Sequence, residues 1–284
     1  MKLPANLVAA LTERKLVLFV GAGFGCASGM PGGDDLARVL AEDTIGSIAG
    51  TSDEGRRPDV ERSRGDLRRL AQIRADVLRA QPTKQWVCDR ISAAQRNADT
   101  GLAQALAELP CMTVFTTNYD TLIEDAHSPA GDCRMIYRGR DLANLGKAWN
   151  VIKLHGHVGD PDSLTLTCDD YDRYEDDPDN QALTEYFRSQ LRANTVVVLG
   201  SALEDTDLRK HFKEIGEKAG GTKTYVLVRG DDDPRKAEWE RYGVRFLTGE
   251  IDAFLSEIRA QYETKVATRP ELPRVPGTGG DRDC

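Results

Sequence analysis

Short runs of apolar, often β-branched residues recur along the chain, and most of them end abruptly in glycine or a polar side chain. The strands expected from these runs cover residues 16–20, 112–116, 151–154, 195–199, 224–228 and 244–247. Between the runs, apolar residues recur at the spacing of a helix. Buried strands that alternate with helices predict an α/β fold with a Rossmann-like, doubly wound parallel sheet of about six strands.

The chain is expected to form one large domain and a short tail. Residues 1–265 make up the domain, and residues 35–109 form a helical insertion that is poor in strand signals. Within the insertion, residues 51–79 interleave arginines with acidic residues, which favours a solvated, salt-bridged surface. The alternative is a docking face for a partner protein or a nucleic acid. Residues 266–284 are rich in proline and glycine, so a flexible C-terminal tail is expected.

Charge and hydropathy exclude some classes of partner. The net charge of −8 argues against a general nucleic-acid binder, because neutralising phosphates requires an excess of lysine and arginine. No direct nucleic-acid binding is therefore expected. No apolar run approaches the roughly 20 residues that cross a bilayer, so no membrane association is expected. The apolar segment before Glu13 is too short for a signal peptide.

The cysteines give no sign of a metal site. All six are scattered, and no CxxC pair is present to form a zinc ribbon, so no metal is expected. Free thiols in a chain with no expected signal peptide suit the reducing cytoplasm, which is the expected location.

The first apolar run ends in a glycine turn that indicates a nucleotide site. Gly21, Ala22 and Gly23 follow the strand directly, and Ser28 stands just downstream. Such a turn lets the backbone approach a ligand, and amide groups at a helix start can bind phosphate. A P-loop is excluded because no Gly-Lys-Ser/Thr follows the strand. The dehydrogenase fingerprint fails as well, since Cys26 stands where its third glycine belongs.

Three further strands also end in residues suited to ligand binding. The residues after them are Thr117, Asn118, Tyr119 and Asp120; His155, Gly156 and His157; and Gly200 and Ser201. In a doubly wound sheet, ligands bind outside the carboxyl ends of the strands. The four polar or glycine-rich endings are therefore expected to meet along one edge.

Four segments together resemble a known superfamily. In chain order, GAGFGCASGMP, TTNYD, KLHGH and LGSALEDTDL resemble the motifs of the sirtuin superfamily, in particular its prokaryotic, zinc-free, sirtuin-like branch. The resemblance covers residues 16–208. The four zinc cysteines of the sirtuin deacylases are absent, and the helical insertion stands in place of the zinc domain. The resemblance thus implies that residues 1–265 form a sirtuin-like, NAD-binding catalytic domain without zinc.

The resemblance also implies a reaction, with NAD as substrate. The expected activity is that of an NAD+ glycohydrolase, which cleaves the nicotinamide N-glycosidic bond to give nicotinamide and ADP-ribose. This branch is associated with NAD depletion in prokaryotic antiphage defence. Nicotinamide leaves as a neutral pyridine, so the pair of carboxylic acids that glycosidases use is not required. A histidine with a pKa near 6.5 suits the work of a general base.

Site residues follow from the resemblance, position by position. The expected catalytic residues are Asn118 and His155, with His155 as the general base. The expected NAD-binding residues are Gly21, Ala22, Gly23, Ser28, Thr117, Asp120, Gly200 and Ser201. The first four would line the phosphates and ribose, Asn118 and Asp120 would hold the nicotinamide ribose and carboxamide side, and the last two would contact the adenosine half.

Simpler roles remain open for several of these residues. His155 could be a core or capping histidine, and Asn118 could form an Asx turn or a helix N-cap. His157 and Cys26 are interpreted as structural. Asp205 and Asp207 are interpreted as N-cap and turn residues.

Two other functions remain as alternatives. One is a zinc-free protein deacylase or ADP-ribosyltransferase. The other is a non-catalytic subunit that binds NAD or ADP-ribose and serves as a scaffold for a partner ATPase. Because unchecked NAD loss is toxic, the resemblance implies regulation through a homo-oligomer or through a partner protein such as a HerA-type ATPase or a short Argonaute.

Overall fold

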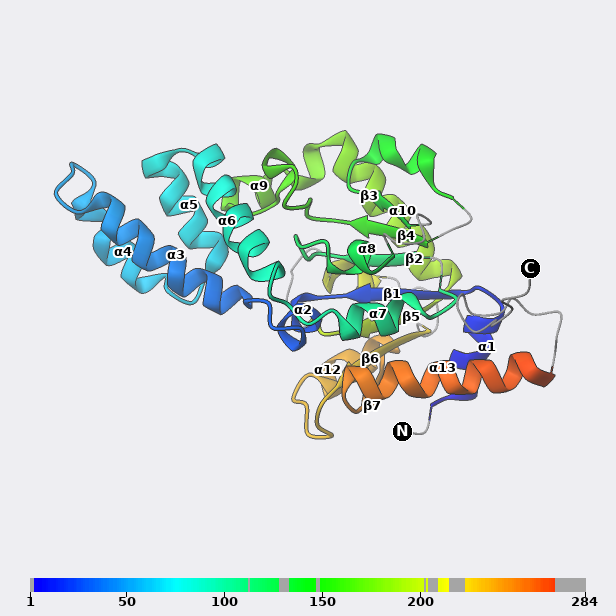
Figure 1. Cartoon of the computed structure of the whole chain (residues 1–284). Helices are drawn as coiled ribbons and strands as arrows, with labels where there is room; N and C mark the ends of the chain where they lie inside the picture. Colours follow the sequence, from blue (N-terminus) through cyan, green and yellow to red (C-terminus); the bar gives the residue numbers. More distant parts are fainter. Residues whose placement is uncertain are drawn as a thin grey trace, which may run out of the picture.

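A single parallel sheet of seven strands forms the centre of the protein (Figure 1). The computed structural model describes residues 3–111, 113–127, 133–146, 149–201, 203, 209–214 and 223–268. The strands are β1 (Leu16–Val20), β2 (Thr113–Thr116), β3 (Cys133–Ile136), β4 (Trp149–Lys153), β5 (Thr195–Leu199), β6 (Thr224–Val228) and β7 (Arg245–Thr248). Their order across the sheet is β3-β4-β2-β1-β5-β6-β7. The predicted α/β fold with a doubly wound parallel sheet is confirmed.

The prediction of six strands missed β3, at one edge of the sheet. This strand has four residues, only one of which, Ile136, is buried, and Arg134 is exposed to solvent. An edge strand pairs on one side only and can remain polar. It therefore lacks the continuous apolar run by which the buried strands were predicted.

The central strand β1 is buried on both faces, which explains its unbroken apolar sequence. Leu16, Leu18 and Val20 pack into the hydrophobic core on one face of the sheet. Val17 and Phe19 point to the opposite face and join a second core. Because side chains alternate along a strand, a shift of one residue in register would exchange the two sets.

Helices cover both faces of the sheet. One face packs against α1 (Ala5–Thr12), α7 (Gly101–Ala107), α8 (Leu122–His127) and α13 (Ile251–Thr268), which contribute Leu7, Leu106, Leu122 and Phe254 to its core. The other face packs against α10 (Pro178–Ala193), the helical residues 209–214 and α12 (Lys236–Trp239), which contribute Phe187, Phe212 and Trp239.

The chain order across the sheet marks where a ligand is expected. From β1 the chain builds β2, β3 and β4 on one side, and it then crosses to build β5, β6 and β7 on the other side. The direction of winding thus reverses between β1 and β5. The crevice outside the carboxyl ends at such a reversal is the usual ligand site of doubly wound sheets.

A group of helices, which we call the helical module, extends from the carboxyl end of β1 (Figure 1). A short helix, α2 (Ala22–Ala27), leads from β1 toward it. The module comprises α3 (Gly33–Ile48), α4 (Arg57–Arg62), α5 (Leu67–Leu78) and α6 (Ala80–Gln95). Its apolar residues Val60, Leu70 and Val87 are fully buried and belong to the same core as the first face of the sheet.

The arginines of the module form several ion pairs, as the salt-bridged interpretation predicts. Arg56 lies 3.1 Å from Asp76, at an exposed position. Exposed pairs of this kind contribute at most about 1 kcal/mol each. Arg74 is different, because it is buried and lies 2.6 Å from Asp43.

Several predictions about polar segments and the chain end concern residues that the structure does not describe. The acidic stretch after residue 168 forms a capped helix, α9 (Cys168–Asp172), and leads into α10. Asp205, Asp207 and the predicted tail from residue 269 onward lie outside the described residues. Among the helices that the structure describes, none is long and apolar enough to cross a membrane.

A buried histidine in the second core should make stability depend on pH. The Nε–H group of Arg188 donates to Nδ1 of His211 at 3.0 Å, a bond that requires the neutral imidazole. Burial, reinforced by the charge of Arg188, lowers the pKa of His211 from 6.5 to about 4. Between these values the unfolded chain binds the proton more readily, so stability falls as the pH falls.

We expect the free energy of unfolding to drop by about 2 kcal/mol between pH 7 and pH 5 from His211 alone. Urea denaturation at both pH values measures this loss. The H211Q variant removes the titrating group and should show a smaller loss over the same interval. An equal loss in the wild-type protein and in H211Q would contradict the assignment to His211.

Candidate functional site

The carboxyl ends of β1, β2 and β4 open into one cleft, which we call the main cleft. Its walls include five residues predicted for the site, from three strand ends: Ala22, Thr117, Asn118, Asp120 and His155. The remaining lining residues are Gly25, Met30, Pro31, Gly33, Leu36, Leu67, Ile91, Tyr119 and Tyr171. The predicted meeting of Asn118 and His155 beside the glycine turn is therefore present in the structure.

A second hollow, the β5–β6 hollow, lies at the carboxyl ends of the neighbouring strands. Gly200 and Ser201 line it, together with Arg229, Gly230 and the residues 232–235. The predicted site residues thus divide between two hollows at one edge of the sheet. Gly21, Gly23 and Ser28 line neither of them.

The glycine turn packs directly against the end of β5. Gly21 N donates to Leu199 O at 2.9 Å, and Gly23 N donates to Gly200 O at 2.7 Å. A Cβ atom on Gly21 would lie 2.6 Å from the Cβ of Ser201, and one on Gly23 would lie 2.8 Å from Gly200 O. Both glycines are therefore required by backbone packing. Their two amide groups already have acceptors, so they are not the free phosphate donors that the sequence suggested.

Ser28 lies behind the turn and not in the main cleft. It follows α2, it is buried, and its hydroxyl has no hydrogen-bond partner among the described residues. Its carbonyl oxygen accepts the amide of Asp99 at 2.8 Å. This bond ties the end of α2 to the residues that precede α7.

Asn118 is held after the end of β2 by contacts with Thr116 and with the glycine turn. Its backbone amide donates to Thr116 Oγ1 at 3.0 Å, and its side-chain Nδ2 donates to Gly21 O at 3.2 Å. Its Oδ1 atom is buried and has no partner among the described residues. A buried acceptor without a donor costs about 1–3 kcal/mol, so the arrangement favours a ligand that supplies an N–H or O–H group.

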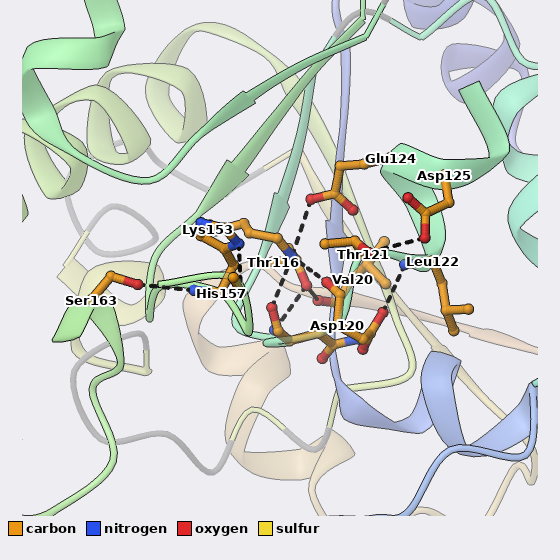
Figure 2. A network of polar contacts seen from close by, with 12 residues as sticks. Val20, Thr116, Asp120, Thr121, Leu122, Glu124, Asp125, Lys153, His157 and Ser163 are labelled. Carbon is orange, nitrogen blue, oxygen red and sulfur yellow. Dashed lines mark hydrogen bonds and ion pairs between the residues drawn. The ribbon is translucent and has the colours of Figure 1, made fainter. Parts of the chain in front are cut away.

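Asp120 combines a structural role with a place in the main cleft. Its Oδ1 accepts the backbone amide of Leu122 at 3.1 Å, at the start of α8 (Figure 2). A carboxylate here satisfies one of the unpaired amides of the first turn and interacts favourably with the helix dipole. The capping role that the sequence allowed for Asn118 therefore belongs to Asp120.

His155 is buried at the end of β4 between two tyrosine rings. Tyr171 and Tyr174 contact its ring edge-on, with centroids 5.4 and 5.7 Å away. The Tyr171 hydroxyl lies 3.5 Å from Nδ1 of His155. The Tyr174 hydroxyl donates to Leu154 O at 2.8 Å, which fixes the backbone beside the histidine.

His157 points away from the main cleft, in keeping with the structural role expected of it. Its Nδ1 accepts the amide of Gly159 at 3.1 Å, and its ring packs against Tyr137 with centroids 4.4 Å apart. Burial, with a smaller effect of the Lys153 charge, lowers the pKa of His157 and favours the neutral ring. Cys26 also lines neither hollow, and it is exposed to solvent.

Sequence reasoning missed the wall that the helical module and α9 supply. Leu67 from α5, Ile91 from α6 and Tyr171 from α9 all line the main cleft. The guanidinium of Arg68 lies over the Tyr171 ring, 4.1 Å from its centroid. These residues stand in no recognisable motif, and they meet only because the module folds back over the sheet edge.

Polar contacts hold α9 against the helical module. Lys84 of α6 is buried and lies 2.7 Å from the carboxylate of Asp170. Gln72 of α5 accepts the amide of Asp169 at 3.0 Å. The position of Tyr171 beside His155 therefore depends on the module. Within the part of the chain that the structure describes, no group of three or more His, Cys, Asp or Glu residues could hold a metal ion.

Comparisons with known proteins agree with this architecture. Residues 112–247 match the family model described as the SIR2-like domain. A solved complex of a mutant Sir2 homologue with 2'-O-acetyl ADP ribose covers 94% of this chain and 99% of its own, with a TM-score of 0.54 and 15% identity. At that identity the likeness concerns the fold alone.

Curated relatives share more of the sequence. The protein named NAD(+) hydrolase ThsA from Cytobacillus dafuensis is 30% identical over 226 residues, which are 78% of this chain and 42% of that protein. The protein of the same name from Acinetobacter baumannii (strain 532279) is 28% identical over 222 residues, 74% of this chain and 42% of its own. The chain thus spans less than half the length of these relatives. The predicted resemblance to the sirtuin-like superfamily is confirmed.

The contact between the two glycine turns can be tested through stability. Gly200 has a φ of +63°, and a Cβ atom there would lie 2.3 Å from Phe24 N. G200A should therefore lower the free energy of unfolding by more than about 2 kcal/mol. Gly46 provides the matched control, because it lies in α3 with no atom within 4 Å of an added Cβ.

We expect G46A to leave stability unchanged or to raise it by up to about 1 kcal/mol, because alanine favours the helix. Urea denaturation of both variants measures the difference. If G200A proved as stable as G46A, the close approach of the two turns would be wrong.

Proposed function

We propose that this chain, given its sirtuin-like fold and motifs, is an NAD+ glycohydrolase that releases nicotinamide and ADP-ribose. The observation that carries the proposal is that Asn118 and His155 line one cleft beside the glycine turn. The name that the curated relatives bear, NAD(+) hydrolase ThsA, supports the same activity.

The proposed reaction uses few groups of the chain. The bond between the ribose C1′ and the nicotinamide nitrogen breaks, and its electron pair stays on the ring, which becomes neutral. The oxygen of a water molecule bonds to C1′, and His155 accepts the proton that this water loses. The proton then passes to bulk solvent. Because the leaving group needs no proton, the reaction requires no acidic side chain aimed at it.

The unpartnered Oδ1 of Asn118 has a place in this scheme. It can accept a hydrogen bond from a ribose hydroxyl or from the nicotinamide carboxamide, both of which carry donors. Nδ2 remains bound to Gly21 O at 3.2 Å, so the amide orientation is already fixed. A fixed acceptor also favours an oxocarbenium-like ribose, because it lies ready before the charge develops.

The two hollows suit the two halves of a dinucleotide. We assign the nicotinamide half to the main cleft, with Ala22, Thr117 and Asp120 beside it, and the adenosine half to the β5–β6 hollow through Gly200 and Ser201. Both hollows lie at the carboxyl ends of neighbouring strands, and the glycine turn lies between them. A dinucleotide would therefore cross the turn.

We further propose that the protein is the NAD-depleting effector of a prokaryotic antiphage defence system in the cytoplasm. The sirtuin-like branch that its motifs resemble supports this role. Activity would then be gated by assembly into a homo-oligomer or by a partner such as a HerA-type ATPase or a short Argonaute, since constant NAD loss would harm the cell.

The catalytic assignment can be tested by substitution. N118A should abolish measurable NAD turnover, and H155A should reduce it about 10²–10⁴-fold as a lost general base. Purified proteins are incubated with NAD and the products are separated by chromatography. Asn97 is exposed in the turn that follows α6 and lines neither hollow, so N97A serves as the matched control with normal turnover.

Outcomes of the same assay separate the alternatives. Turnover by N118A close to that of N97A would overturn the role of Asn118. A loss below tenfold in H155A would indicate another base. Faster NAD consumption with an acyl-lysine peptide than with water alone would favour a deacylase. NAD binding without turnover in any assembly would favour a scaffold subunit.

A further inference from the structure

We propose that Lys153 is the positioning residue that sets the geometry of Asn118 relative to His155. This inference rests on the proposed function, in which these two residues carry the chemistry. Lys153 is the last residue of β4, two positions before His155, and its side chain is 1% exposed. It does not line the main cleft, so it acts through its neighbours and not on the ligand.

The ammonium group of Lys153 is matched by three oxygen atoms. It donates to the backbone carbonyl of Asn118 at 3.1 Å and to that of Asp120 at 2.5 Å. The third oxygen is Oε1 of Glu124 in α8, at 3.1 Å (Figure 2). Two of the three N–H donors of the lysine therefore bond to backbone carbonyls, and the contact with Glu124 is an ion pair.

These bonds shape the loop that carries Asn118. Two carbonyl groups, two residues apart, turn toward one point, which curves the backbone of residues 118–120 around the ammonium. The strand ends also pair directly, because Leu154 N donates to Thr116 O at 2.9 Å. Lys153, which precedes Leu154 and His155, thus fixes the loop that follows Thr116.

Glu124 makes this arrangement compatible with a cationic reaction centre. An unpaired ammonium buried behind the main cleft would repel an oxocarbenium-like ribose. The carboxylate of Glu124, whose side chain is 12% exposed, lies beside Lys153 and offsets its charge, although burial raises the pKa of Glu124 against the effect of Lys153. The pair therefore holds the loop without adding net charge near the site.

Stability alone does not account for this pair. Replacing a buried ion pair with apolar residues is often neutral or stabilising, because desolvation offsets the attraction. The Lys153–Glu124 pair is costly to bury, and Lys153 contacts the backbone of Asn118. Its presence is better explained by the position that it gives to Asn118. Small displacements of such a residue can cost about 100-fold in rate.

The test removes both charges together, in the variant K153M/E124Q, so that no bare carboxylate remains. The control is R74M/D43N, which removes another ion pair with a buried cation, at 2.6 Å, in the helical module and outside both hollows. We expect kcat for NAD hydrolysis to fall about 10–100-fold in K153M/E124Q, with KM changed less than threefold. R74M/D43N should keep the wild-type kcat.

A second readout does not depend on activity. Hydrogen–deuterium exchange, followed by mass spectrometry, should show faster exchange of residues 113–125 in K153M/E124Q than in R74M/D43N. If the exchange differs as expected but the wild-type protein consumes no NAD, the proposed function fails and the structural role of Lys153 stands. If turnover is present and both kcat and exchange match the control, the inference is overturned.

A milder variant covers the case in which K153M/E124Q does not fold. K153Q/E124Q keeps polar groups in the buried space, but the shorter glutamine amide cannot reach both carbonyls and Glu124 at once. The same loss of kcat and the same faster exchange are expected. A kcat within threefold of the control would overturn the proposal for this variant as well.

Discussion

The architecture depends on the direct contact between two backbone turns, one after β1 and one after β5. Gly23 N donates to Gly200 O at 2.7 Å, and neither turn leaves room for a Cβ atom at its closest point. The crevice lies where the direction of winding of the sheet reverses. This contact divides it into two hollows. It also fixes Gly21 O, which in turn orients the side chain of Asn118 at 3.2 Å. The position of the proposed chemistry is thus set by packing between backbones.

Much of this arrangement could be predicted from the sequence because it follows from parallel pairing. Apolar runs gave six of the seven strands, and parallel strands bring their carboxyl ends to one edge. That rule alone places Asn118 and His155 together. The edge strand β3 was missed because a strand that pairs on one side needs no apolar run, and Arg134 interrupts the pattern.

Other features could not be predicted, since they depend on distances between segments far apart in the chain. The sequence cannot show that the amides of Gly21 and Gly23 are taken up by β5, or that Lys153 reaches the carbonyls beyond β2. Tyr171 lies in an acidic stretch of the sequence that belongs to none of the four motifs. It reaches His155 only because Lys84 and Gln72 hold α9 in place.

The unsatisfied oxygen of Asn118 has a consequence for the evolution of this protein. Among the described residues the buried Oδ1 of Asn118 has no donor, which costs stability, and under the proposed function a ligand would supply that donor. Selection for heat resistance alone would therefore favour apolar replacements at this position, and selection for turnover would oppose them. At a position of this type, thermal stability and catalytic activity conflict. A thermostable descendant that has lost Asn118 would therefore indicate relaxed selection on the proposed reaction.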